Sequence, residues 1–302
     1  MSTTTITVAS PRWAVLARVR DYVELTKPRI TALELVVVVT AAVVATWGQP
    51  NPRVVWHTLV GTLLIAASAS AANQWIERRR DARMSRTADR PLPAGRLAAW
   101  EAAAFAAAAL VGGAAYLAWF VNLPCLAWSL ATWLVYVVAY TPLKTISPVN
   151  TAVGAVAGAL PVLIGWTATG AALDLRALAL TLLLFLWQFP HFMAIAWLYR
   201  HEYARAGHRM LTVVDPSGRR AGWQAVLAAL AIIPVSIVPV LGNPGIGSVL
   251  FLVAATLLGA GQLALAAAFW HQTTEHRARL LLRASLVYLP TLLAMLMLVP
   301  WL

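Results

Sequence analysis

The sequence contains little charge and almost no cysteine. Only 11% of its 302 residues are charged and 61% are hydrophobic, which excludes an ordinary water-soluble globular domain. The single cysteine, Cys125, lies in an apolar stretch, so an internal disulfide and a multi-cysteine metal site are excluded. Acidic residues are scarce as well, since 11 Asp and Glu stand against 23 Lys and Arg. In so apolar a chain, this excess indicates loops beside an anionic membrane surface, and we expect no nucleic-acid partner.

Long apolar segments take up most of the chain. Each has roughly the 20 residues that cross a lipid bilayer as an α-helix, and they are too long for barrel strands. We therefore expect an all-α polytopic membrane protein with about nine transmembrane helices in a bundle. The segments cover residues 30–48, 54–76, 97–119, 123–140, 150–168, 176–198, 222–241, 247–269 and 280–299.

Positive charge gathers on one side of this arrangement. With nine spans, all Lys and Arg except Arg53 and Arg176 fall near the N-terminus or on or beside the loops that share its side of the membrane. Because cytoplasmic loops are enriched in Lys and Arg, we expect this side in the cytoplasm and the protein in a bacterial cytoplasmic (inner) membrane. The loops lie near residues 77–96, 141–149, 199–221 and 270–279.

The first 29 residues differ from the rest of the chain. Residues 11–27 alternate arginines with apolar residues, which is typical of a helix lying on the membrane surface. The segment lacks the apolar core of a secretory signal peptide. We expect a cytoplasmic N-terminal segment over residues 1–29 and one transmembrane domain over residues 30–302.

The most informative polar stretch follows directly on the second apolar segment. Asn73, Glu77 and Asp81 are spaced by four residues, so on a helix they share one face. Two carboxylates on successive turns repel each other, and Mg²⁺ between them would remove that cost while binding phosphate oxygens. Arg86 and Arg90 follow, with guanidinium groups suited to phosphate. The stretch predicts a diphosphate site with Mg²⁺; the alternative is charge compensation in a solvated loop.

Two further polar loops share this side. Loop 199–221 places Glu202 among arginines and histidines, next to Tyr203, and loop 141–149 adds Lys144 beside Tyr140. Three polar loops over an apolar bundle favour a ligand with a charged head group at the mouth and a hydrophobic tail inside.

Polar residues are rare inside the predicted spans, and in a membrane such residues are often functional. Gln188 and His191 lie in the sixth span, within W-Q-F-P-H-F, toward the side with the polar loops. His191 has two possible roles: a functional contact, or an ordinary hydrogen bond to a neighbouring helix. Gly154, Gly158 and Gly165 in the fifth span predict close helix packing.

The segment Asn73–Pro93 resembles the N-x-x-x-D-x-x-x-D motif of UbiA-type membrane prenyltransferases. Residues 25–298 are similar to the protoheme IX farnesyltransferases (heme O synthases) among them. Glu77 stands where Asp is more common, but it still offers a carboxylate. The second loop lacks the paired aspartates of the wider family, which leaves a second metal near Glu202 open. The narrower similarity rests on M-S-R-T-A-D-R-P-L at 84–92, L-T-K-P-R-I at 25–30, Y-T-P-L-K with the following run to 166, W-Q-F-P-H-F at 187–192, Y-A-R-A-G-H-R-M-L at 203–211 and R-A-S-L-V-Y-L-P at 283–290.

This resemblance implies transfer of a farnesyl group from farnesyl diphosphate to a vinyl group of heme b, with addition of water, to give heme O and diphosphate. It implies Mg²⁺ on Glu77 and Asp81, and contact of His191 with heme as an iron ligand or a propionate partner. It also implies heme A synthase or terminal-oxidase assembly factors as partners. The implied catalytic residues are Asn73, Glu77, Asp81, Arg86, Arg90, Lys144 and His191, and the implied substrate-binding residues are Lys27, Arg29, Tyr140, Gln188, Glu202 and Tyr203.

Other functions stay open at this point. An enzyme of the same class could prenylate an aromatic acid or a quinone precursor, and a protein of another class could be a transporter. Against a transporter, the charges gather at one membrane face instead of the midplane, and no pair of broken helices related by inversion is visible. A non-catalytic scaffold for assembly of a terminal oxidase is a third possibility.

Overall fold

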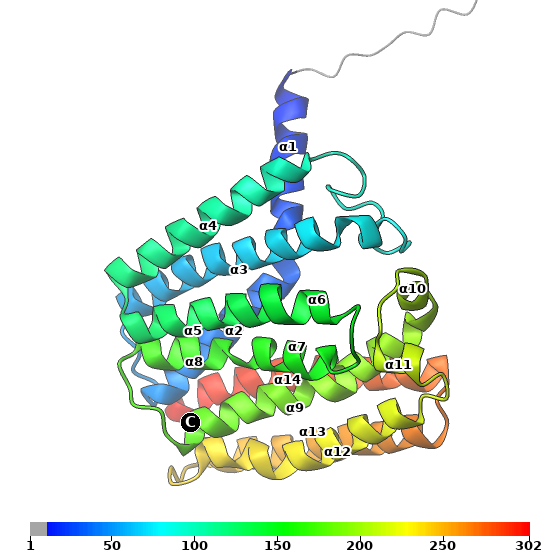
Figure 1. Ribbon diagram of the computed structural model, residues 1–302. Coiled ribbons are helices and arrows are strands. Elements are labelled where there is room, and N and C mark those ends of the chain that lie inside the picture. Colours follow the sequence, from blue (N-terminus) through cyan, green and yellow to red (C-terminus); the bar gives the residue numbers. More distant parts are fainter. Residues whose placement is uncertain (1–10) are drawn as a thin grey trace, which may run out of the picture.

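The computed structural model describes residues 11–302, and this part of the chain is helical without strands (Figure 1). Within it, nine helical segments are long and apolar enough to cross a membrane, which confirms the predicted fold. The spans are α2 (Pro28–Ala45), α3 (Pro52–Asp81), α4 (Ala99–Phe120), α5 with η1 and α6 (Leu123–Leu134, Val135–Tyr140, Thr141–Leu143), α7 with α8 (Asn150–Ala159, Pro161–Ala168), α9 (Leu175–Leu198), α12 with η2 (Arg219–Ile237, Val238–Val240), α13 (Ile246–His271) and α14 with η3 (Glu275–Leu298, Val299–Trp301).

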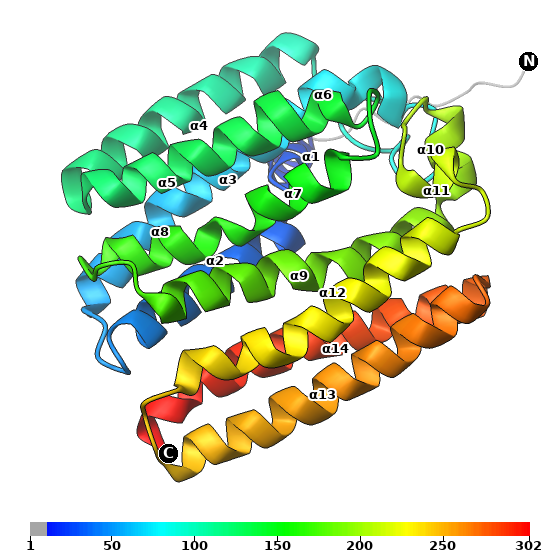
Figure 2. The same cartoon turned by 60° about the horizontal axis from the view of Figure 1, so that its bottom comes forward.

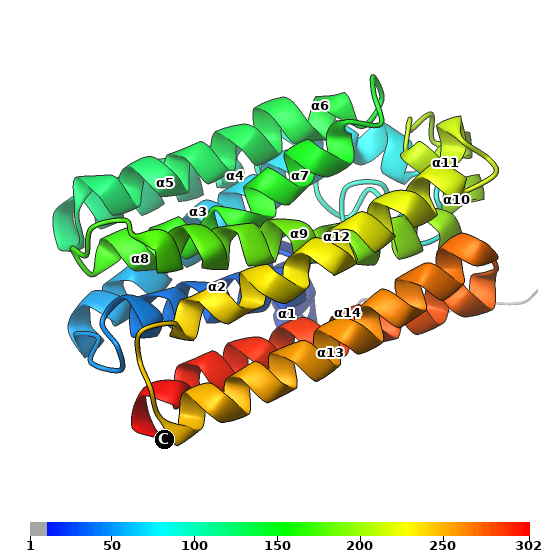
Figure 3. The same cartoon turned by 90° about the horizontal axis from the view of Figure 1, so that it is seen from below.

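The spans lie side by side and run from one end of the molecule to the other (Figures 1 and 2). The strongest packing joins α3 to α4, α12 to α13 and α9, and α2 to α8. The loop after α3 and the short helices α10 (Arg200–Arg205) and α11 (Leu211–Val214) gather at one end, whereas the C-terminus lies at the other (Figure 3). We call the end with these loops the polar end.

Small residues allow the helices to approach closely. A side chain at Gly165 in α8 would overlap the backbone carbonyl of Val38 in α2, and one at Gly154 in α7 would lie 2.7 Å from the ring of Tyr140. The predicted role of these glycines in helix packing is confirmed. Around the bundle, large apolar side chains point outward, such as Trp119 with 84% of its surface exposed. Lipid is the solvent that such a surface suits.

Helix α1 (Pro11–Leu25) stands across the direction of the spans near the polar end (Figure 1). Arg96 holds it there by donating to Asp21 (2.7 Å) and Glu24 (2.8 Å), and Arg18 pairs with Glu101. The orientation and the apolar outer face are those that a surface helix would have, and its location at the membrane surface stays a prediction. Residues 1–10 of the predicted N-terminal segment lie outside the described residues. The outer face consists of Val15, Leu16, Val19 and Val23.

Candidate active site

Three polar side chains line one face of the last two turns of α3. Asn73, Glu77 and Asp81 are 0%, 4% and 2% exposed, although they lie at the polar end where α3 leaves the bundle. Helix α3 continues five residues beyond the predicted boundary at residue 76, because these side chains are covered and paired. The four-residue spacing therefore places a buried polar row on a helix, as predicted.

Glu77 is the centre of this row. Its Oε2 accepts hydrogen bonds from Asn73 Nδ2 and from Lys144 Nζ, both at 2.9 Å. Its Oε1 is buried and has no hydrogen-bond partner among the described residues. A buried carboxylate oxygen without a donor is costly, so this atom fits a ligand that supplies positive charge. Asn73 Nδ2 also donates to Thr141 Oγ1 (3.0 Å), which links α3 to the segment that carries Lys144.

Asp81 is held by the loop that follows it. Arg90 Nη1 donates to its Oδ2 at 2.7 Å, and the Thr87 hydroxyl donates to its backbone carbonyl at 2.8 Å. The loop thus folds back over the end of α3, and each carboxylate of the row has its own cation.

Lys27 and Lys144 complete the cluster. Lys27 Nζ donates to Asn73 Oδ1 (2.5 Å) and to the Tyr136 hydroxyl (3.2 Å). Burial, with the charges of Arg90 and Lys144, lowers the pKa of Lys27 to about 7. Burial also disfavours the Lys144 ammonium, but the carboxylate of Glu77 outweighs it and raises the pKa of Lys144. The cluster holds more cationic groups than carboxylates, as an anion site should.

The second loop closes over the first. Ser85 Oγ donates to Glu202 Oε1 (3.0 Å), and the Arg86 backbone N–H points to Glu202 Oε2 (3.5 Å). The Arg86 guanidinium donates to the Tyr203 hydroxyl (3.3 Å) and lies 4.8 Å from the centre of the Tyr199 ring. Glu202 and Tyr203, which were predicted to bind substrate, therefore contact the loop after α3 at the polar end.

The predicted residues in α9 lie deeper in the bundle. His191 Nδ1 shares a hydrogen bond with Ser285 Oγ (2.9 Å), and its ring stacks on Trp187 at 4.8 Å. Gln188 Nε2 donates to the carbonyls of Ala155 (2.9 Å) and Leu184 (3.1 Å). The contacts with Ser285 in α14 and Ala155 in α7 join α9 to other helices, which is the structural alternative considered for His191. Contact of either side chain with a substrate stays a prediction.

Of two further predicted residues, Tyr140 contacts the cluster of buried charges and Arg29 does not. The Tyr140 ring lies under the Lys144 ammonium at 4.6 Å. Arg29 is exposed at the start of α2 and makes no hydrogen bond or ion pair with the cluster within residues 11–302. Thr141, Tyr136 and Ser85 take part without having been predicted. Hydroxyl groups in apolar or loop sequence carry no pattern that separates them from ordinary helix residues, so no sequence signal could have found them.

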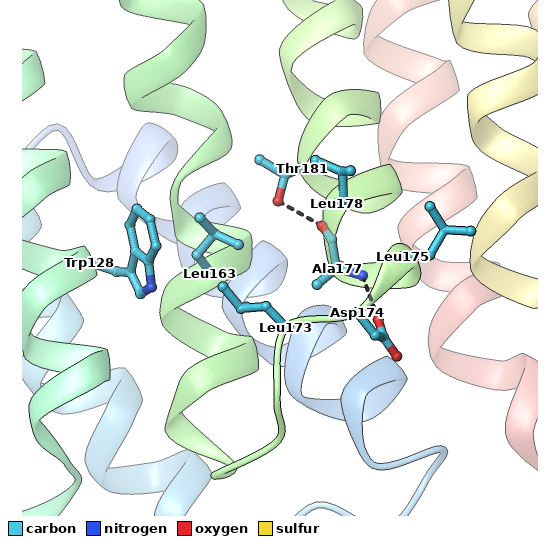
Figure 4. A pocket seen from close by; sticks show the side chains of 8 residues that line it. All are labelled: Trp128, Leu163, Leu173, Asp174, Leu175, Ala177, Leu178 and Thr181. Carbon is cyan, nitrogen blue, oxygen red and sulfur yellow. Dashed lines mark hydrogen bonds between the residues drawn. The ribbon is translucent and has the colours of Figure 1, made fainter.

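An apolar pocket opens at the other end of the molecule, between α5, α8 and α9 (Figure 4). Its polar features are ordinary helix contacts, since Asp174 caps α9 and Thr181 bonds to the carbonyl of Ala177. It is remote from the buried carboxylates and belongs to the lipid-facing surface. The lining residues are Trp128, Leu163, Leu173, Asp174, Leu175, Ala177, Leu178 and Thr181.

The polar row suits a hard divalent cation only together with an anionic ligand. Glu77 and Asp81 offer two carboxylates, and in residues 11–302 no third Asp, Glu, His or Cys joins them in a metal-binding group. Mg²⁺ commonly takes one or two carboxylates and fills its shell with water and phosphate. The unpartnered Oε1 of Glu77 therefore fits Mg²⁺ bound with a diphosphate.

Sequence comparison matches residues 35–297 to the UbiA prenyltransferase family. Among similar curated proteins, one from Koribacter versatilis is 40% identical, covering 99% of this chain and 99% of the relative, and one from Rhodopirellula baltica is 44% identical, covering 90% and 96%. Both carry the name protoheme IX farnesyltransferase, and a mitochondrial protein of Arabidopsis thaliana with that name is 38% identical over 92% of this chain and 64% of its own length.

Solved structures show the same fold at low sequence identity. A digeranylgeranylglyceryl phosphate synthase superposes with a TM-score of 0.78 at 15% identity, covering 94% of this chain and 99% of its own. A UbiA homolog from Archaeoglobus fulgidus, bound to DMAPP and Mg²⁺, superposes with a TM-score of 0.71 at 17% identity, covering 93% and 99%.

Proposed function

Because this chain belongs to the UbiA prenyltransferase family, we propose that it transfers a farnesyl group from farnesyl diphosphate to a vinyl group of heme b and adds water, forming heme O and diphosphate. Three curated relatives with 38–44% identity carry the name of that reaction. The observation in the molecule that carries the proposal is the buried row on α3, in which two carboxylates are surrounded by lysines and arginines beneath two polar loops.

The proposed chemistry begins with ionisation of the allylic C–O bond. This step develops negative charge on the diphosphate, so cationic groups already fixed in place stabilise the transition state more than the ground state. Lys144, Arg90 and Arg86 are the residues proposed to receive that charge. Mg²⁺ held by Glu77 and Asp81 would supply further positive charge to the leaving group.

The second half of the reaction takes place in the apolar interior. The allylic cation is attacked by the vinyl group of heme, and the cation formed beside the porphyrin ring is trapped by water. The bundle excludes water from the first cation, because the spans below the polar row are packed with apolar side chains. His191 is proposed to contact heme, as an iron ligand or a propionate partner, from its place beside Trp187 and Ser285.

We propose the bacterial cytoplasmic membrane as the location, with the polar end in the cytoplasm. All Lys and Arg other than Arg53 and Arg176 are near this end of the bundle, and positive loops are retained on the cytoplasmic side. The proposed substrates are farnesyl diphosphate and heme b. Heme A synthase or terminal-oxidase assembly factors are the proposed protein partners.

The experiment is to express the full chain in a bacterial host, extract the hemes and separate them by chromatography with mass detection. The expected product is heavier than heme b by a hydrated farnesyl group, and it is absent with Asp81→Asn. Arg205→Ala, an exposed change on the second loop, is the control that should leave the product in place. If the folded wild-type protein yields only heme b, the proposal is wrong, and aromatic acids are the next acceptors to test.

A further inference from the structure

His208, on the loop after α10, is a buried side chain without an assigned role in the proposed reaction. It is only 3% exposed, and its Nδ1 has no hydrogen-bond partner among the described residues. A buried imidazole nitrogen without a partner costs free energy, and a ligand bound during function is a common reason for keeping one. The question is whether His208 lies where a ligand is expected.

The backbone fixes His208 at the polar cluster. Helix α10 ends at Arg205, and Gly207 just after it has the left-handed φ of +75° that glycine adopts without strain. This turn brings the His208 N–H back to the Tyr203 carbonyl at 2.9 Å. The next residue, Arg209, donates its N–H to the carbonyl of Lys144 at 2.6 Å. The helix end thus anchors His208 directly beside the segment that carries Lys144.

The side chain of His208 also meets the other loop. Its ring packs edge-on against Tyr203 at 5.9 Å, and the Tyr203 hydroxyl accepts from Arg86. The loop that carries His208 thus contacts the segment of Lys144 and, through Tyr203, Arg86, two of the cations proposed to receive the diphosphate. Burial lowers the pKa of His208, which favours the neutral ring, and a neutral imidazole still offers one N–H donor.

From this position we infer that His208 is a further diphosphate-binding residue, donating a hydrogen bond from its imidazole to a phosphate oxygen of the diphosphate that Lys144 and Arg86 are proposed to bind. The inference rests on the proposed function, because it assigns a contact to the same substrate. A hydrogen bond to a charged group is commonly strong enough that its loss weakens binding by about tenfold or more.

The test is calorimetric titration of inorganic diphosphate with Mg²⁺ into the full-length protein in detergent. His208→Phe retains an aromatic ring against Tyr203 and removes the donor, so we expect diphosphate affinity to fall by about tenfold or more. His208→Asn and His208→Gln each restore an N–H near one of the two ring nitrogens, and one of them should recover most of the affinity. Arg205→Ala, exposed on the same loop, is the matched control and should bind as the wild type does.

Kinetics separate binding from a purely structural effect. His208→Phe should raise the KM for farnesyl diphosphate and the inhibition constant of diphosphate by a similar factor, with the KM for heme unchanged. Equal diphosphate affinity in folded His208→Phe and wild type would overturn the inference; should that variant fail to fold, His208→Met decides by the same comparison. A wild-type protein that does not bind Mg²⁺-diphosphate at all would instead overturn the proposed function.

Discussion

Buried charged residues in the polar cluster are paired with one another. Removing one of them leaves the charge of its partner buried and uncompensated, which costs free energy of folding. Lys144 is the partner of Glu77 Oε2 at 2.9 Å, and both side chains are largely covered. Lys144→Met should lower the free energy of unfolding by about 3 kcal/mol, because it leaves a buried carboxylate without its cation. Thermal unfolding in detergent measures this.

Adding Glu77→Gln to Lys144→Met should recover most of the lost stability, since the buried charge is then gone. Prenyl transfer should be lost in both variants, because the anion site lacks a cation in each. A Lys144→Met protein as stable as the wild type would contradict the pairing.

Lys27 gives the site a dependence on pH. Its pKa of about 7 means that the side chain is mostly neutral at pH 8 without a ligand, and a bound diphosphate favours the ammonium form. Diphosphate binding should therefore take up a proton, up to about one per site, above pH 7 and not well below it. Calorimetry at pH 8 in buffers of different ionisation enthalpy counts the protons. Lys27→Arg stays charged at all these values, so an unchanged uptake in that variant would show that another group is responsible.

Among the helices, the contact between α2 and α8 leaves no room for a side chain. A methyl group at Gly165 would meet the Val38 carbonyl, a backbone atom that cannot rotate away. Gly165→Ala should destabilise the protein by about 1–3 kcal/mol through overpacking. Gly112 in α4 is the matched control, because nothing lies within 4 Å of a side chain there and Gly112→Ala should not destabilise. Equal melting temperatures for the two variants would show that α2 and α8 are not so closely packed.

The helices themselves could be predicted because a span needs only about 20 apolar residues, a local property of the chain. Details that depend on neighbours could not. The predicted apolar segment ends at residue 76, five residues before α3 does, since Glu77 and Asp81 are charged and only the folded chain pairs them with Lys144 and Arg90. The π-helical turn of η1 was not predicted for the same reason.

The candidate site was predictable to a similar depth. The four-residue spacing on α3 was enough to place Asn73, Glu77 and Asp81 together. Which cation meets which carboxylate depends on how the loops fold, and Lys144 lies 67 positions from Glu77. His208 and Ser85 are ordinary polar residues in sequence, and only the folded loops show what they contact.

Positive charge is concentrated at one end of the whole molecule, and this asymmetry predicts its orientation in the membrane. The C-terminus lies at the end opposite the polar loops (Figure 1). Alkaline phosphatase fused after Leu302 should be active outside the cytoplasm, whereas green fluorescent protein fused at the N-terminus should fluoresce inside it. The reverse pattern would place the polar end outside and remove the cytoplasmic assignment.

Glu77 pairs with Lys144, and Asp81 pairs with Arg90. In the proposed reaction, entry of a prenyl diphosphate with its metal is therefore an exchange of partners in which the cations pass from carboxylate to phosphate. When the diphosphate departs, the ion pairs between these cations and the two carboxylates form again, and their formation favours product release. Metal and diphosphate would then arrive and leave as one unit.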